Sequence, residues 1–136
     1  MGTTQTEKER LLSLHARHVT ALDDGDLDEL AEVFDPNCLI FDGPSPVVRG
    51  WPAYRDRLEH RLRDFTTFGV RSFDEITRVD ERRDDRIAWI AARYEAKGEK
   101  NGQPYLESGR WTGIYEKRND RWQIVHFHVS PDPKSP

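Results

Sequence analysis

The chain has 136 residues, with 21 lysines and arginines against 25 aspartates and glutamates, and its formal net charge is −4. This length allows one buried core, so we expect a single domain over residues 1–136, with a folded core over about 7–130 and a loose, proline-rich tail at 131–136. The mixed and slightly acidic charge excludes the basic surface that a nucleic acid or an anionic membrane would select, so neither is an expected partner.

Cysteine content and hydropathy indicate the cellular compartment of the protein. Cys38 is the only cysteine, which excludes an internal disulfide and a cysteine-based metal site. The N-terminal residues contain no apolar segment of the kind found in a signal peptide, and no stretch approaches the roughly 18 apolar residues of a membrane span. These features predict a cytoplasmic protein.

Two capping signals open the first helices. Thr6 followed by Glu9 predicts a helix in which apolar residues recur at helical spacing until Gly25. The same type of signal begins at Asp26 and predicts a short second helix that stops before Pro36.

A buried strand and a third helix follow. Cys38–Phe41 is short and apolar and is ended by Gly43, which is typical of a buried strand. Trp51–Arg63 then places its apolar residues at steps of three and four on one face, with Pro52 tolerated in the first turn. This segment predicts the third helix.

From Phe65 onward the apolar pattern becomes that of strands. We expect strands at about 68–79, 87–97, 105–117 and 121–130, joined by hairpin turns at Asp84-Asp85, Lys100–Gly102 and Asn119-Asp120. Helices followed by an antiparallel meander indicate an α+β domain whose helices pack on one face of a curved sheet.

Several short segments, taken in order, resemble one group of proteins. These segments are Gly25-Asp26, Phe34–Pro36, Val48–Gly50, Asn119–Trp122 and Val125–Ser130. Their order and spacing resemble the nuclear transport factor 2-like superfamily, over about residues 7–130. Within it, the chain is similar to SnoaL-like domains and to the association (hub) domain of calcium/calmodulin-dependent protein kinase II.

The resemblance implies a cone-shaped α+β fold, with three N-terminal helices on a strongly curved antiparallel sheet that also forms a homodimer. It further implies a ligand pocket inside the cone. On this resemblance Arg93 falls on a pocket arginine and Tyr54 on the position of a pocket histidine. A second pocket arginine of the hub domain is replaced by Gly113, and this departure leaves the ligand open.

The last predicted strand carries two histidines, and in a regular strand His126 and His128 face the same side. If Asn119-Asp120 is a two-residue turn, Gly113 lies opposite His126 and Trp111 opposite His128. The resemblance makes this face the pocket floor, so Trp111 and both histidines are candidate ligand-binding residues. The alternative is that the histidines complete a polar layer of the core.

Arg93 is the candidate anion receptor, because a guanidinium turned into a pocket needs an anionic partner. The alternative is a structural salt bridge or a solvated side chain. A simple two-residue turn at Asn101-Gly102 would place Arg110, rather than Trp111, on the face of Arg93. A bulge is therefore expected if Arg93 and Trp111 share the pocket.

Asp42 is the candidate catalytic residue. It follows the first strand, where the resemblance opens the pocket, and ketosteroid isomerase, a relative, carries its proton-transferring aspartate at a similar place. A carboxylate between apolar walls can act as a general base. Asp42 before Gly43-Pro44 is also an ordinary turn residue, and Tyr54 and Trp111 can equally be core residues.

Two histidines without a further ligand do not define a metal site, so we expect no metal and no cofactor. The preferred hypothesis is a pocket protein that binds a compact, carboxylate-bearing small molecule. Two alternatives stay open: an isomerase, dehydratase or cyclase that uses Asp42 as general base, and an oligomeric assembly module without pocket function.

Overall fold

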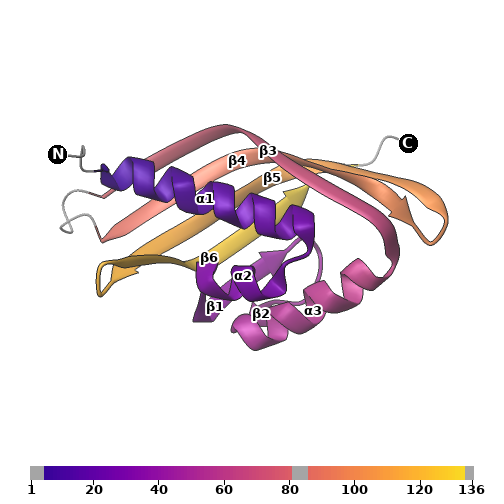
Figure 1. Ribbon diagram of the computed structural model, residues 1–136, viewed down its shortest axis with the longest axis horizontal. Helices are drawn as coiled ribbons and strands as arrows, with labels where there is room; N and C mark the ends of the chain where they lie inside the picture. The colour runs from indigo at the N-terminus through magenta and orange to yellow at the C-terminus, as the bar shows by residue number, and fades with distance from the viewer. Residues whose placement is uncertain (1–4, 81–85, 134–136) are drawn as a thin grey trace.

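The computed structural model describes residues 5–80 and 86–133 and shows three helices and a six-stranded sheet (Figure 1). In chain order the elements are α1 (Glu7–Asp24), α2 (Leu27–Val33), β1 (Phe34–Asp42), β2 (Val48–Arg49), α3 (Trp51–Arg63), β3 (Phe65–Val79), β4 (Ile87–Lys100), β5 (Gln103–Arg118) and β6 (Arg121–Pro131). The predicted α+β class and the three N-terminal helices are thus present.

The predicted caps position the first two helices. The Thr6 hydroxyl accepts a hydrogen bond from the Glu9 amide at 3.1 Å, and Gly25 ends α1 in the left-handed conformation with φ 69°. The Asp26 carboxylate accepts from the Glu29 amide at 3.0 Å and opens α2. None of the helices in the described parts of the chain combines the length and hydropathy needed to cross a bilayer.

The strands lie in the order β2-β1-β6-β5-β4-β3, and all neighbouring pairs are antiparallel except β1 and β6. β1 begins at Phe34, earlier than predicted, and its pairing with β6 is irregular between Phe34 and Leu39, around Pro36. Proline lacks the amide that a regular ladder requires. The two-residue strand β2 was not predicted, and the predicted Asp84-Asp85 turn lies outside the described residues.

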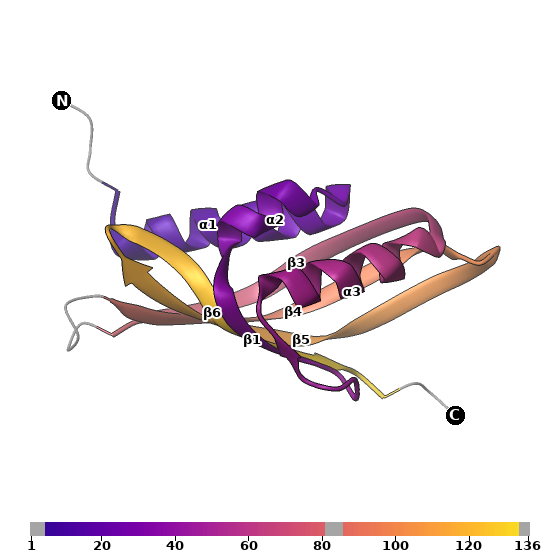
Figure 2. The same cartoon turned by 90° about the horizontal axis from the view of Figure 1, so that it is seen from below.

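All three helices lie on the same side of the sheet (Figure 2). The sheet face beneath them, called the inner face here, contributes alternating buried side chains such as Ile90, Tyr94, Trp111 and Tyr115. The other face, called the outer face, carries no helix in the described parts of the chain. The inner face and the helices therefore enclose the core.

A β-bulge in β6 decides which side chains reach the inner face. Tyr115 pairs with Ile124, but the next residue of β5, Ile114, pairs with His126, so Val125 is an extra residue. Trp122 and Ile124 precede the bulge and are buried; Phe127 and Val129 follow it and are also buried. The extra residue shifts the alternation by one position, and all four apolar side chains face inward.

Candidate functional site

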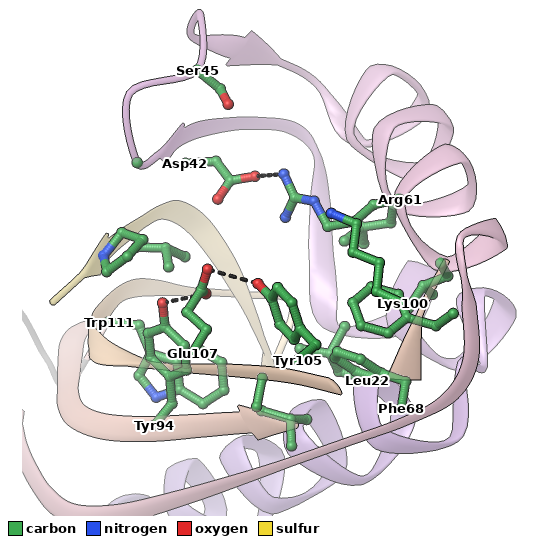
Figure 3. A pocket seen from close by; sticks show the side chains of 18 of the residues that line it. Leu22, Asp42, Ser45, Arg61, Phe68, Tyr94, Lys100, Tyr105, Glu107 and Trp111 are labelled. Atoms are coloured by element: carbon green, nitrogen blue, oxygen red, sulfur yellow. Dashed lines mark hydrogen bonds and ion pairs between the residues drawn. The ribbon is translucent and has the colours of Figure 1, made fainter. Parts of the chain in front are cut away.

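A cavity of about 270 Å³ lies between the inner face of the sheet and α3 (Figure 3). Apolar side chains from several elements form most of its wall, including Leu22, Leu58, Phe68, Val70, Phe127 and Val129. The polar side chains among them are Asp42, Ser45, Tyr54, Arg61, Tyr94, Lys100, Tyr105 and Glu107. A mainly apolar cavity with a few convergent polar groups is typical of a small-molecule site.

Asp42 and Arg61 form an ion pair in the cavity wall. A terminal nitrogen of Arg61, Nη2, donates to Oδ2 of Asp42, whose side chain is 8 % exposed, while that of Arg61 is 39 % exposed. Burial alone would lower the pKa of the Arg61 guanidinium, but the Asp42 charge and hydrogen bond raise it. The remaining guanidinium nitrogens can still donate to a ligand.

A second cluster of polar side chains surrounds Glu107 on β5. The Tyr94 hydroxyl donates to its Oε2 at 2.7 Å and the Tyr105 hydroxyl donates to its Oε1 at 2.9 Å. Burial and the hydrogen bond to Glu107 raise the pKa of Tyr105 to about 12 and raise that of Tyr94 further still. Both tyrosines therefore remain protonated donors at neutral pH.

Lys100 reaches the cavity from the hairpin between β4 and β5. Its ammonium lies 5.7 Å from the ring centre of Phe65 and 5.5 Å from that of Tyr105, which are cation–π distances. No carboxylate lies within ion-pair distance of Lys100 among residues 5–80 and 86–133. Its charge is therefore available to a ligand.

Trp111 connects the cavity wall to two buried histidines on α1. Its indole nitrogen donates to the Ser72 hydroxyl at 3.3 Å, and the same hydroxyl lies 2.9 Å from Nε2 of His15. His18 stacks on Trp111 at 5.7 Å between ring centres. Burial lowers the pKa of His15, and burial followed by the nearby His15 lowers that of His18 to about 3.

Three of the predicted site residues meet at the cavity. Asp42 ends β1, Tyr54 projects from α3 and Trp111 from β5, and each of them is at most 7 % exposed. Burial, followed by the nearby Asp42 charge, raises the pKa of the Tyr54 hydroxyl. These placements agree with the sequence analysis, and the roles of the three residues stay predictions.

Arg93 does not reach the cavity, contrary to the expectation that it faces the pocket. It lies exposed on the outer face, with its guanidinium 5.6 Å from the ring centre of Phe73. The turn at Asn101-Gly102 keeps β4 and β5 in simple register, so Arg93 pairs with Arg110 and Ala92 pairs with Trp111. The expected bulge between these strands is absent, and alternation places Arg93 opposite to Trp111.

The two histidines also lie on the outer face, so the expectation that they form the pocket floor is wrong. The bulge at Val125 moves His126 opposite Ile114 and His128 opposite Thr112. Their rings contact the exposed ring of Phe41, at 5.2 Å for His126 and 6.0 Å for His128. Phe127 occupies the inner position between them.

Sequence reasoning missed Arg61, Tyr94, Lys100, Tyr105 and Glu107, although periodicity carried a signal for most of them. Arg61 follows Tyr54 by seven residues and shares its helical face. Glu107 and Tyr105 precede Trp111 by even steps along one strand, and Tyr94 and Lys100 share the inner face of β4.

The described parts of the chain offer no ready metal site. Among residues 5–80 and 86–133, no three histidine, cysteine, aspartate or glutamate side chains gather closely enough to hold an ion. The buried cysteine Cys38 lies in β1, and burial raises its thiol pKa to about 11, so it is a poor thiolate ligand at neutral pH.

A comparison with known protein families identifies the family of this chain. Residues 11–133 match the SnoaL-like domain. The chain belongs to the SnoaL-like family. This match confirms the superfamily that the sequence segments resemble.

Solved structures of other proteins share the fold. A nuclear transport factor 2-like protein from Salmonella enterica serovar Typhimurium superposes with a TM-score of 0.84 at 20 % identity, covering 98 % of this chain and 96 % of its own. A Xanthomonas campestris protein, named as a candidate calcium/calmodulin-dependent protein kinase II association domain, gives 0.79 at 23 %, covering 96 % and 91 %. A cystatin-like-fold protein of unknown function from Nostoc punctiforme gives 0.75 at 18 %, covering 98 % of each chain.

Proposed function

We propose that this SnoaL-like protein binds a compact, carboxylate-bearing small molecule in the cavity, with Lys100 and Arg61 as the anion-binding residues. The observation that carries the proposal is the Lys100 ammonium, which faces aromatic rings and no carboxylate in the described parts of the chain. An anion placed between Lys100 and the unpaired nitrogens of Arg61 would receive charge-assisted hydrogen bonds. This assignment replaces Arg93, which lies on the outer face.

The apolar wall supports the same proposal. Leu58, Phe68, Val70 and Phe127 line the cavity and would contact the body of a ligand whose carboxylate points at Lys100. Burial of apolar ligand surface contributes about 25 cal/mol per Å². Polar groups at one end and apolar walls at the other would fix the orientation of the ligand.

The test is the thermal stability of the purified protein with benzoate, phenylacetate and cyclohexanecarboxylate, followed by calorimetric titration of any probe that stabilises it. Binding to the folded chain raises the melting temperature by mass action. Lys100→Met keeps the aliphatic stem against Phe65 and Tyr105 but removes the charge, and we expect it to weaken binding roughly tenfold or more. Lys97→Met, on the same strand and exposed, is the matched control.

Two results would contradict the proposal. One is that no carboxylate in the panel stabilises the wild-type protein. The other is that Lys100→Met binds the probes as tightly as Lys97→Met does. Arg93→Ala adds an independent check, because its exposed position predicts unchanged binding.

Proton transfer from carbon is the second candidate function, because Asp42 and the buried hydroxyl of Tyr54 line the same cavity. A carboxylate could remove the proton while a hydroxyl stabilises the enolate. The ion pair with Arg61 occupies one oxygen of Asp42, which is why binding is the preferred proposal. Deuterium exchange into cyclic ketones, followed by NMR, would reveal such an activity, and Asp42→Asn would abolish it.

We also propose that the protein forms a homodimer through the outer face. Ile114 on β5 and Trp89 on β4 lie side by side there and are both 37 % exposed, and Phe41, 43 % exposed, lies on β1 beyond the two histidines of β6. Contiguous exposed apolar surface is typical of an interaction site. The Xanthomonas campestris protein that shares the fold is named as a candidate association domain, which supports assembly as a property to test.

A further inference from the structure

Glu107 holds a fixed position in the cavity. The Tyr94 hydroxyl binds one of its carboxylate oxygens and the Tyr105 hydroxyl binds the other, at 2.7 and 2.9 Å. Tyr94 is itself 3 % exposed and stacks on Trp111 with 4.8 Å between ring centres. The carboxylate therefore cannot swing away from the cavity without breaking two hydrogen bonds.

The two tyrosines use only part of the hydrogen-bonding capacity of the Glu107 carboxylate. A carboxylate offers about four lone-pair sites, and the tyrosine hydroxyls occupy one on each oxygen. No lysine, arginine or histidine lies within ion-pair distance of Glu107 in the described parts of the chain. A half-buried acceptor with free capacity, held in a mainly apolar cavity, favours a ligand that brings its own donor.

Glu107 faces the anion-binding residues across the cavity. Figure 3 shows the Asp42–Arg61 pair on one side, Glu107 and its tyrosines on the other, and Lys100 extending into the space beside them. Glu107 is close enough for its charge to contribute to the raised pKa of Arg61. A short ligand could therefore contact both sides at once.

We infer that Glu107 recognises a hydrogen-bond donor on the ligand, so that the preferred ligand class is a hydroxy or amino carboxylic acid with an apolar body. The inference rests on the proposed function and adds to it the second polar contact. The carboxylate of such a ligand would lie against Lys100 and Arg61, and its hydroxyl or ammonium group would donate to Glu107. An acceptor that a bound ligand seals from water discriminates against a competing ligand that leaves it without a partner.

The cavity volume limits the size of this ligand. A volume of about 270 Å³ lies near the lower end of small-molecule pockets, which range from about 300 to 1,000 Å³. A single aromatic or cyclohexyl ring with a carboxyl group and one further polar group is of this order. Matched pairs of such compounds differ by one hydroxyl and isolate the contribution of Glu107.

The experiment is calorimetric titration with two pairs of probes, benzoate against 3- and 4-hydroxybenzoate, and 3-phenylpropanoate against 3-phenyllactate. We expect the wild-type protein to bind at least one hydroxylated probe about tenfold more tightly than its parent. In Glu107→Gln this advantage should fall below about threefold. Glu99→Gln, exposed on the same sheet, should keep it.

The failure of this inference differs from the failure of the proposed function. Two results would overturn the inference alone: the parent carboxylates bind but hydroxylation never improves their affinity, or the advantage persists in Glu107→Gln. In either case Glu107 does not recognise a donor, and only the proposed anion-binding site remains. If neither the parents nor the hydroxylated probes bind, both proposals are overturned. Unchanged affinity of Glu107→Gln for the parent carboxylates would show that this variant is folded, so that a loss confined to the hydroxylated probes reports the contact with Glu107.

Discussion

Protonation of the buried histidine on α1 is expected to make the fold sensitive to mild acid. His18 is 2 % exposed, its ring contacts Phe34, Trp111 and Phe127, and its Nδ1 has no hydrogen-bond partner among the described residues. Burial, with a smaller contribution from His15, lowers its pKa from 6.5 to about 3. The folded chain therefore leaves His18 neutral at a pH where the unfolded chain protonates it.

The linkage between proton binding and folding gives the sign and size of the change in unfolding free energy with pH. Below pH 6.5 the unfolded state binds a proton that the folded state excludes, so stability is present above this pH and is lost as the pH falls toward 3. The loss approaches about 1.4 kcal/mol per pH unit for one such group. Between pH 7 and pH 5 His18 should remove about 2 kcal/mol of unfolding free energy.

Urea unfolding followed by tryptophan fluorescence at pH 7, 6 and 5 measures this loss. His18→Leu fills a similar volume without a titrating group, so its stability should decrease by about 2 kcal/mol less than that of the wild type over this range. His60→Leu, at an exposed position on α3, should follow the wild-type profile. If the His18→Leu and wild-type profiles run parallel, His18 is not a buried neutral group and the reasoning fails.

Three further predictions address packing, the ion pair and assembly. Gly98→Ala would drive a Cβ into the backbone carbonyl of Thr67 and should destabilise the fold by about 1–3 kcal/mol in urea unfolding; an unchanged midpoint would contradict the close strand packing. Arg61→Ala leaves the carboxylate of Asp42 without its partner and should cost about 2–3 kcal/mol, most of which Asp42→Asn should restore in the double variant; additive losses would argue against the pair. Trp89→Ser should convert a dimer to a monomer in sedimentation velocity, whereas Val47→Ser, 39 % exposed in the loop before β2, should not; a monomeric wild-type protein would refute the dimer.

The parts of the fold that depend on local interactions could be predicted from the sequence. The caps at Thr6 and Asp26 and the two-residue turn at Asn119-Asp120 act over a few residues, and the structure contains all of them. The parallel pairing of β1 with β6 could not be predicted in this way, because it joins segments that are about 90 residues apart. Nothing in the local pattern specifies such a partner.

The residues of the candidate site could be predicted only where side chains follow the regular periodicity of their strand or helix. Trp111 on regular β5 and Tyr54 on α3 line the cavity as their periodicity suggests. His126 and His128 do not, because Val125 interrupts the alternation. The order of apolar residues held a clue: only an extra residue between Ile124 and Phe127 lets every large apolar side chain of β6 face the core.

The bulge in β6 determines which face of the sheet each later side chain of the strand occupies. Deletion of Val125 would remove the bulge and leave a regular strand in which both imidazoles stay on the outer face and Phe127 and Val129 stay in the core. Regular pairing that kept Val125 would instead turn both imidazoles into the core and expel Phe127 and Val129 to the surface. In related chains, whether a histidine at the end of this strand faces the interior or the exterior therefore depends on whether the strand is bulged, and not on residue type alone.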